Sequence, residues 1–473
     1  MACVILPQTR TAAIACAVLL ASWFEVSLCR VKNTIKSPQD LKLRGWELHR
    51  RMGVHGRGCD PTPRQTRLLR TMQIRFCITN LHGMLFGMLD RPRHLATIRR
   101  LLRNFQAVAI LGARQVGKTT LAQAVAAEFG KRARLFDLET DRDLRLLQDP
   151  EPVLAPLRGL VVIDEVQRLP SLFPPLRPLL DRRPVPARFL LLGSASPSVA
   201  TRGSESLAGR ITYHELDGLG LDEVGADRWQ RLWLRGGFPR SFTAKSDASS
   251  MEWRRAFVQT YLERDVLDTG LRMPPAELRR FWQMLAHWHG QRWNASEFAR
   301  AFGASEATVR RWLETLEGFY AIRLLRPWHA SIAKRQVKAP KVYLRDSGML
   351  HALLGINSSG ELRERPQVGA SFEGFVVEQV IHASGALPHE TYHWATPQGA
   401  ELDLLLVRGN RRIGIEVKCT ESPVVTRSME IAMKDLRLQK LWLIHRGDMR
   451  FTMRPGIEAL PVAELGALSS ALD

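Results

Sequence analysis

Cysteine and long apolar runs are scarce in this chain. Of its 473 residues, six are cysteine. Five of them lie within the first 87 residues: Cys3, Cys16, Cys29, Cys59 and Cys77. Cys419 has no partner in the remaining sequence, which excludes a disulfide framework there. The apolar stretch at residues 11–24 is too short to span a bilayer, and the 13 histidines show no zinc-ligand spacing.

Acidic residues are in the minority, with 47 Asp and Glu against 68 Lys and Arg, giving a net charge of +21. Such an excess favours nucleic acid or another polyanion as a partner. Much of the excess belongs to residues 1–87, which hold 13 Lys and Arg against 4 Asp and Glu and show no lasting helical or strand period. We expect these residues to be a disordered or mis-started extension, with the chain proper beginning near Met84 or Met88. A targeting signal or a small domain is the alternative.

A phosphate-binding loop is the most informative feature. Residues 112–120 match the spacing GxxxxGK[ST], between an apolar run at 107–111 that predicts a buried strand and a predicted helix at 121–129. The N–H groups of such a loop and of the helix N-terminus bind phosphate oxygens. Lys118 is expected to reach the β- and γ-phosphates, and the Thr119 hydroxyl to bind Mg²⁺. The predicted ATP-binding residues are Gly112, Ala113, Arg114, Gln115, Val116, Gly117, Lys118, Thr119 and Thr120.

Two more predicted strands end in polar side chains. The apolar run 160–163 leads into Asp164 and Glu165, which resembles a Walker B strand. Asp164 is expected to support the Mg²⁺ ion, and Glu165 to orient and deprotonate the attacking water. Ser194 follows the apolar run 189–193, and is a candidate sensor of the γ-phosphate or the cap of the next turn. This order favours ATP hydrolysis over nucleotide storage.

Arg210 is a candidate contact to the γ-phosphate, in its own subunit or in a neighbour's. There it would stabilise the charge that develops in phosphoryl transfer. The alternative is an ordinary surface arginine. A contact made from a neighbouring subunit would require an oligomer.

Motifs along residues 88–465 resemble a family of prokaryotic AAA-type ATP-binding proteins. Beyond the loop and the Asp-Glu strand, these motifs are Leu207–Arg210, Arg235–Pro239, Tyr261–Asp265, Pro327-Trp328, Lys334-Arg335, Lys338–Tyr343, Asp346–Gly348 and Gly399–Asp403. The resemblance implies an ATPase core, a helical region, a winged-helix segment and a C-terminal domain of unknown function. Leu219-Gly-Leu replaces the usual Pro-Leu-Ser-like turn, and Ala395 replaces a common arginine.

A helix-turn-helix is predicted within residues 275–326. Ser296 is the expected cap of a first helix, the sequence 303–305 forms the turn, and Ser305 caps a second helix over 306–316. Val309, Leu313 and Leu316 are predicted to point inward. Arg310 and Arg311 would remain on the surface, suitably placed for DNA phosphates. A helical module that packs between domains without touching DNA is the alternative.

The C-terminal region predicts a hairpin with a Gly409-Asn410 turn. Its register would set Asp403 opposite Glu416 and place both on one face with Lys418. The other face would carry Leu402, Leu404, Ile415 and Val417. Opposed carboxylates repel each other, so a divalent cation between them would stabilise the pair.

This arrangement resembles the PD-(D/E)xK nuclease fold, with Glu373 on a preceding helix as an additional acidic ligand and a better match than Glu378. Lys418 could then stabilise a metal-activated hydroxide. The candidate nuclease site is Glu373, Asp403, Glu416 and Lys418. A solvated hairpin with an exposed Glu401–Lys418 pair is the alternative.

These observations predict an α/β protein with a parallel-sheet P-loop core, a helical and winged-helix middle, and an α/β nuclease-like C-terminal domain. The expected boundaries are 1–87 for the extension, 88–245 for the ATPase, 246–345 for the middle and 346–473 for the last domain. We expect a cytoplasmic, Mg²⁺-dependent ATPase without a membrane partner that relays a conformational change through the helix-turn-helix. DNA, a protein partner and oligomerisation fit this prediction. The alternatives are a nucleotide switch without useful turnover and a metal-dependent nuclease, with a second divalent metal, regulated by the ATPase.

Overall fold

The computed structural model describes residues 91–195, 207, 209–261, 273–328 and 339–468. The expectation for residues 1–87 therefore lies outside the described residues. Within the described ranges, no helix combines the length and apolarity needed to cross a bilayer.

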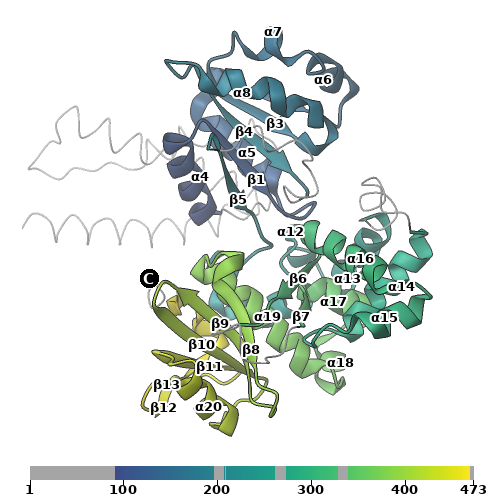
Figure 1. Cartoon of the computed structure of the whole chain (residues 1–473), viewed down its shortest axis with the longest axis vertical. Coiled ribbons are helices and arrows are strands. Elements are labelled where there is room, and N and C mark those ends of the chain that lie inside the picture. Colours follow the sequence, from purple (N-terminus) through teal and green to yellow (C-terminus); the bar gives the residue numbers. More distant parts are fainter. Residues whose placement is uncertain (1–90, 196–206, 208, 262–272, 329–338, 469–473) are drawn as a thin grey trace, which may run out of the picture. The chain divides into compact units, whose positions relative to one another are not determined.

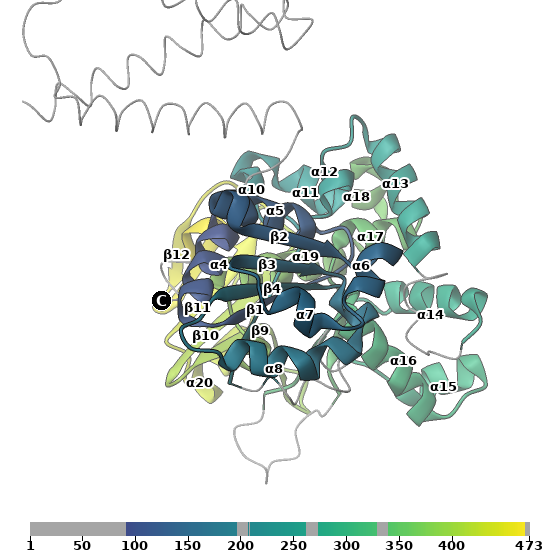
Figure 2. The ribbon, with the colours of Figure 1, turned by 90° about the horizontal axis from the view of Figure 1, so that it is seen from above.

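The first domain is built on a five-stranded parallel sheet in the order β2-β3-β4-β1-β5. The strands are β1 (Ala107–Leu111), β2 (Ala133–Asp137), β3 (Gly159–Asp164), β4 (Ala187–Gly193) and β5 (Ile211–Glu215). Figure 2 shows β2, β3, β4 and β1 side by side in this order. The nearly continuous apolar runs of β1, β3 and β4 reflect burial on both faces of the sheet. The predicted parallel-sheet P-loop core is confirmed.

Helices cover both faces of this sheet (Figure 1). The helices are α4 (Pro92–Asn104), α5 (Lys118–Phe129), α6 (Asp141–Leu146), α7 (Pro150–Leu154) and α8 (Phe173–Asp181), with 3₁₀ turns at Gly130–Arg132, Val166–Arg168 and Pro170–Leu172. Because strand side chains alternate, Ile110 packs with α4 and α5, whereas Ala109 packs with α7 and α8 on the opposite face. Because the strands are parallel, their carboxyl ends lie at the same edge of the sheet, where α5 begins.

The middle of the chain is mainly helical. Its elements are α10 (Leu221–Val224), a 3₁₀ turn (Ala226–Arg228), α11 (Trp229–Arg235), α12 (Pro239–Phe242), α13 (Asp247–Thr260), α14 (Pro275–His287), α15 (Ala295–Phe302), α16 (Glu306–Gly318), β6 (Ile322–Leu325) and β7 (Lys341–Leu344). The strands β6 and β7 pair antiparallel. They follow α15 and α16 in the chain, and the winged helix stays a prediction.

The caps of α15 and α16 differ. Ser305 caps α16 by accepting the Thr308 N–H at 3.1 Å, as predicted. Ser296 does not cap α15, because that helix already begins at Ala295 and its N-cap position is Asn294. Ser296 instead donates its hydroxyl to Asn294 Oδ1 at 2.9 Å.

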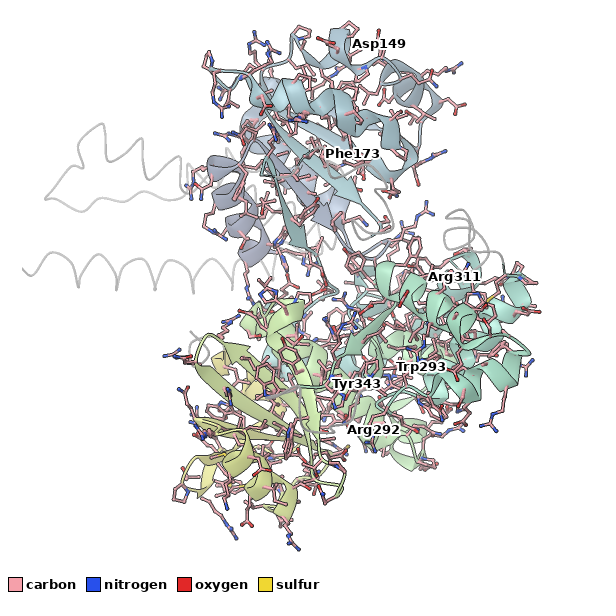
Figure 3. All side chains as sticks on the ribbon, in the orientation of Figure 1. Asp149, Phe173, Arg292, Trp293, Arg311 and Tyr343 are labelled. Atoms are coloured by element: carbon pink, nitrogen blue, oxygen red, sulfur yellow. The ribbon has the colours of Figure 1, made fainter. Side chains whose placement is uncertain are left out.

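The side chains of α16 divide as the helical period predicts. Val309, Leu313 and Leu316 are buried. Arg310 and Arg311 are exposed, and Figure 3 labels Arg311 on this helix. Arg310 lies 3.8 Å from the carboxylate of Glu306 one turn earlier.

The C-terminal domain contains a six-stranded mixed sheet in the order β12-β13-β11-β10-β9-β8. From Ser347 to the last described residue, the elements are α17 (Ser347–Leu353), α18 (Ser359–Glu364), α19 (Val368–Ser384), a 3₁₀ turn (Pro388–Glu390), β8 (Thr391–Ala395), β9 (Glu401–Arg408), β10 (Arg411–Lys418), α20 (Arg427–Asp435), β11 (Lys440–His445), β12 (Phe451–Arg454), β13 (Ile457–Pro461) and a 3₁₀ segment (Val462–Ala467). Helix α19 packs on β10 from one face, and α20 packs from the other.

The predicted hairpin has the expected register at its turn, where Arg408 pairs with Arg411 and Leu404 with Ile415. One side chain departs from the prediction. Leu402 packs in the cluster around α20, whereas Leu404 belongs to the cluster around α19. The pairing of β8 with β9 is irregular at this point, and such an irregularity breaks the strict two-residue alternation of side chains.

Candidate functional site

Two glycines give the phosphate-binding loop its shape. Gly117 has a φ of 103°, which only glycine adopts without strain. A Cβ placed on Gly112 would lie 2.2 Å from the carbonyl oxygen of Leu216. The loop between them leads directly into the first turn of α5, so its N–H groups and the helix N-terminus serve one anion site.

Lys118 is buried and lies at the centre of this site, with 5% of its surface exposed. Its Nζ donates to the carbonyl oxygens of Gly112 and Ala113, each at 3.0 Å, and to Ser194 Oγ at 2.9 Å. The ammonium is therefore held over the loop that would cradle the phosphates. Phosphate oxygens are charged acceptors and form stronger hydrogen bonds with an ammonium than neutral carbonyls do.

The predicted magnesium residues lie side by side. Thr119 Oγ1 donates to Asp164 Oδ2 at 2.6 Å. A hydroxyl in the first turn of α5 and a carboxylate at the end of β3 are oxygen donors of the kind that Mg²⁺ prefers. Burial raises the pKa of Asp164, and the charge of Glu165 adds to this effect. The residues present thus fit a magnesium ion bound next to ATP.

Glu165 is held by two polar neighbours. Its Oε1 accepts the Ser194 hydroxyl at 3.1 Å, and its Oε2 accepts the side-chain amide of Gln167. The backbone of Glu165 has a φ of 53°, a left-handed conformation that is costly for a residue other than glycine. The carboxylate is therefore fixed in place beside Ser194, which in turn contacts Lys118.

Gln167 was not predicted from the sequence. Besides its bond to Glu165, its Oε1 accepts the Ser194 N–H at 3.4 Å. Its position two residues after Glu165 is the one signal that could have marked it.

Arg210 does not lie at the phosphate end of the sheet. It precedes β5, and its carbonyl oxygen accepts the N–H of Ala107, the first residue of β1, at 3.3 Å. The loop follows Leu111 at the opposite end of β1, about 16 Å away at roughly 3.3 Å per residue. Arg210 also pairs with Asp181 of α8 at 2.6 Å. The predicted contact within the same subunit is therefore wrong, and a contact to a neighbouring subunit stays a prediction.

Arg114 also points away from the phosphate centre, since it pairs with Glu139 at 2.5 Å on the surface.

A cavity next to the loop begins at Ala113 and Val116 and continues between the segment after β5 and the middle helices. Phe238, Tyr261 and Trp282 contribute aromatic rings to its lining.

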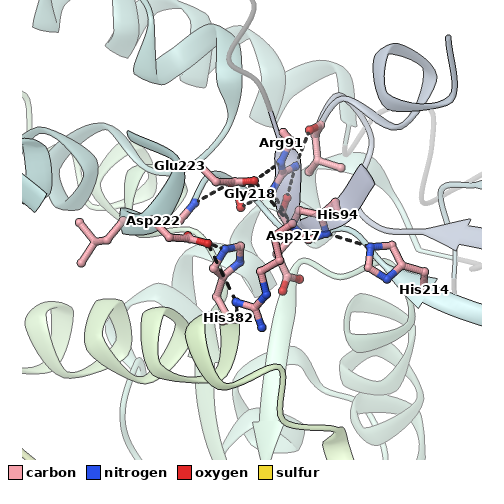
Figure 4. A network of polar contacts seen from close by, with 12 residues as sticks. Arg91, His94, His214, Asp217, Gly218, Asp222, Glu223 and His382 are labelled. Carbon is pink, nitrogen blue, oxygen red and sulfur yellow. Dashed lines mark hydrogen bonds and ion pairs between the residues drawn. The ribbon is translucent and has the colours of Figure 1, made fainter. Parts of the chain in front are cut away.

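A buried arginine connects the loop with the segment after β5 (Figure 4). Arg91 donates to the Val116 carbonyl oxygen at 3.3 Å and to the Asp217 carbonyl oxygen at 2.8 Å. Its guanidinium also binds both carboxylate oxygens of Glu223, at 2.6 and 2.9 Å. This fork fixes the geometry of the pair.

Three histidines adjoin this arginine. Arg91 Nη2 lies 3.3 Å from His94 Nε2 and can only donate, so His94 Nε2 accepts and its Nδ1–H donates to His214 Nε2 at 2.8 Å. His382 of α19 lies 3.0 Å from Asp222. Burial alone would lower the pKa of His382, but its hydrogen bond to Asp222 and the nearby carboxylates outweigh burial and raise it.

Helix α19 is bound to the end of the ATPase sheet by further polar contacts. Arg345, directly after β7, donates to Glu215 at 2.6 Å and also binds Asp217, both next to the end of β5. The same guanidinium lies 3.5 Å from Glu378 of α19. The next residue, Gln379, accepts the Leu221 N–H at 2.9 Å.

Two of the predicted nuclease residues contact a lysine that was not predicted to belong to this site. Lys341 of β7 donates to Glu373 Oε1 at 3.0 Å and to Asp403 Oδ1 at 3.1 Å. Asp403 Oδ2 also accepts the Val417 N–H at 3.0 Å. Lys418 pairs with Glu416 at 2.8 Å. We call Glu373, Asp403 and Glu416 the acidic pocket.

The acidic pocket as arranged does not fit a divalent metal. In the described part of the chain, one group of three side chains brings metal-ligating atoms within 4.8 Å of one another, and it is His94, Glu223 and His382. In the acidic pocket the ammonium of Lys341 stands between two of the carboxylates instead. The histidine group is itself satisfied, because Arg91 binds both oxygens of Glu223.

Comparisons with known proteins agree with the ATPase geometry. Residues 104–225 match an AAA domain, residues 226–360 a domain of unknown function (DUF8612), and residues 368–465 a domain of unknown function (DUF4143). The chain is 45% identical over 380 residues to the uncharacterized proteins Rv2008c of Mycobacterium tuberculosis and Mb2031c of Mycobacterium bovis, covering 80% of this chain and 85% of each relative.

Two solved structures have weaker similarity. The Walker-type ATPase Paby2304 of Pyrococcus abyssi is 16% identical, with a TM-score of 0.40, over 56% of this chain and 96% of that one. The Aeropyrum pernix ORC1 protein in complex with DNA is 12% identical, with a TM-score of 0.30, over 57% of this chain and 93% of that one.

Proposed function

The chain belongs to the family of these two mycobacterial proteins, and from this premise we propose that its AAA domain hydrolyses ATP with Mg²⁺. The observation that carries the proposal is the connected set Lys118–Ser194–Glu165, which lies beside the Thr119–Asp164 pair. It joins a phosphate-binding ammonium to a carboxylate able to accept a proton. A site for nucleotide storage has no need of such a base.

Each residue has a distinct role in this proposal. The loop N–H groups and Lys118 bind the phosphates, and Thr119 with Asp164 holds Mg²⁺, which neutralises phosphate charge when bound. Glu165 orients the attacking water and takes its proton. Ser194 and Gln167 hold that carboxylate in position. The cavity beside Ala113 and Val116 would receive the nucleoside.

We further propose that the nucleotide state reaches the C-terminal domain through α19. The Leu216 N–H donates to the Leu111 carbonyl oxygen at 2.7 Å, so the loop and the segment after β5 move together. Arg91 and Arg345 then bind this segment, and Arg345 also contacts α19. This route does not pass through the helix-turn-helix, through which we expected the change to be relayed.

The test is phosphate release from ATP by the full chain with Mg²⁺, with and without duplex or branched DNA, beside Lys118→Ala. Release that the variant lacks supports the ATPase, and stimulation by DNA identifies the partner. Hydrolysis that ignores DNA directs the search to a protein partner. ATP binding without hydrolysis would replace the proposal with a nucleotide switch.

A metal-dependent nuclease is a separate proposal for the C-terminal domain. It is supported by the order α19-β8-β9-β10-α20-β11, which brings Glu373 and Asp403 close together. Lys341 stands between these carboxylates, so the proposal requires the lysine to move before a metal binds. It predicts that Asp403→Ala or Lys418→Ala removes DNA cleavage while ATP hydrolysis survives. Variants that cleave like the parent chain would end this idea.

A further inference from the structure

We infer that Lys341 is a built-in counter-ion that keeps divalent cations out of the acidic pocket while β7 is in place. The ammonium makes direct contacts with two of the three carboxylates, Glu373 at 3.0 Å and Asp403 at 3.1 Å. Lys341 has 5% of its surface exposed. It therefore lies where a cation shared by these carboxylates would have to bind.

The remaining contacts of the pocket support an internal cation. Tyr343, two residues along β7 and labelled in Figure 3, donates its hydroxyl to the same Glu373 oxygen at 2.5 Å. Asp403 has one oxygen on Lys341 and the other on the Val417 N–H. Both carboxylates thus have their hydrogen bonds without a metal, and a metal would have to displace a charged donor.

Glu416 shows that the pocket retains an unused acceptor. Its Oε1 pairs with Lys418, but its Oε2 is buried and has no hydrogen-bond partner in the described structure. A buried carboxylate oxygen without a partner is costly. Removal of the Lys341 charge would leave Glu373 and Asp403 without the cation that they share, and available to a divalent ion.

The backbone around Lys341 holds it in place. Strand β7 pairs with β6, and Gly290 and Trp293 donate to the carbonyl oxygens of Val342 and Pro340, each at 2.8 Å. Four residues after Lys341, Arg345 binds the end of β5. A shift of this strand would move the lysine, so the pocket is closed by an element that also contacts the ATPase domain.

The test is a Mn²⁺ titration of the full chain, without nucleotide, followed by the electron paramagnetic resonance of the free ion. Binding in the acidic pocket is the difference in bound Mn²⁺ between each protein and the same protein carrying Asp403→Asn. The parent chain should have none. Lys341→Met should gain one ion per chain, and Lys341→Met/Asp403→Asn should lose it.

Lys440→Met is the matched control. Lys440 pairs with Glu458 in the same domain at 2.6 Å, so this substitution removes one positive charge outside the pocket. It should gain no ion. Lys341→Gln is a second variant that keeps amide donors for both carboxylates if the methionine impairs folding. A parent chain that already binds Mn²⁺ through Asp403 would overturn the inference, as would a folded Lys341 variant that gains none. The Mn²⁺ titration does not depend on ATP hydrolysis, so it tests this inference separately from the proposed ATPase activity.

Discussion

The hydroxyl of Ser194 donates to Glu165 at 3.1 Å while it accepts the Lys118 ammonium at 2.9 Å. One side chain at the end of β4 therefore contacts both the phosphate-binding residue and the proposed base. Its position follows from the sheet order, because β4 lies between β1, which leads into the loop, and β3, which ends at Asp164.

Ser194→Ala should lower ATP turnover by roughly 10- to 100-fold, because Glu165 loses a group that holds it in position. ATP binding should change by only a few-fold, since the loop and Lys118 are retained. Single-turnover hydrolysis and an equilibrium binding titration separate the two effects. Ser296→Ala, at an exposed serine of α15, should match the parent. Unchanged turnover in Ser194→Ala would remove Ser194 from the mechanism.

If Arg210 serves a neighbouring subunit, Arg210→Ala and Lys118→Ala should each be inactive alone but regain activity when mixed. Each mixed interface can then combine an intact loop with an intact arginine. Asp181→Ala, which removes the Arg210–Asp181 ion pair, should leave activity in place. Turnover measured across mixing ratios is the readout. Full activity of Arg210→Ala by itself would leave the arginine an ordinary surface residue.

The Arg91–Glu223 pair should matter for stability. Both side chains are buried, and Arg91→Met leaves an unpaired carboxylate, which costs about 3–5 kcal/mol. Arg91→Met/Glu223→Gln should recover part of this loss. Arg99→Met, which breaks the exposed Arg99–Glu128 pair between α4 and α5, should cost at most about 1 kcal/mol. Urea unfolding measures all three, and equal losses in Arg91→Met and Arg99→Met would contradict the account.

His289 should make the chain sensitive to acid. Its Nδ1 accepts the Leu344 N–H of β7 at 3.0 Å, and burial lowers its pKa to about 3. Below pH 6.5, the ordinary pKa of histidine, His289 binds a proton in the unfolded chain but stays neutral in the folded chain. The stabilisation is therefore complete above pH 6.5 and decreases by about 1.4 kcal/mol per pH unit from there towards pH 3.

His289→Asn keeps an acceptor for the Leu344 N–H but cannot titrate in this range. The pH dependence of its unfolding free energy between pH 6 and 4 should be shallower than the parent's by about one proton. Urea unfolding at several pH values tests this. Parallel pH profiles would show that His289 does not contribute.

The sequence predicted those parts of the site that depend on contiguous residues or on strand ends. The loop at 112–120 is one uninterrupted motif, and the carboxyl ends of parallel strands meet at one edge, so Asp164 and Ser194 could be placed beside it. The same reasoning failed for Arg210, because the residues before β5 belong to the opposite edge. The strand Ile211–Glu215 was not predicted, so Arg210 could not be assigned to an end of the sheet.

Contacts between distant segments could not be predicted. Lys341 lies 62 residues from Asp403, and Arg91 lies 132 residues from Glu223. No local period links such pairs. Ser296 and Leu402 were misplaced for local reasons, a helix that begins two residues earlier than expected and an irregularity between β8 and β9.

The most direct test of the central claim is Mg²⁺-ATP turnover by Glu165→Gln, with ATP affinity measured on the same preparation. The variant keeps the size of the side chain and one acceptor oxygen but cannot take a proton. We predict that it binds ATP like the parent and loses turnover by at least about 100-fold. Turnover at the parent's rate, with ATP bound, would contradict the assignment of Glu165 as the base and with it the proposed hydrolytic site.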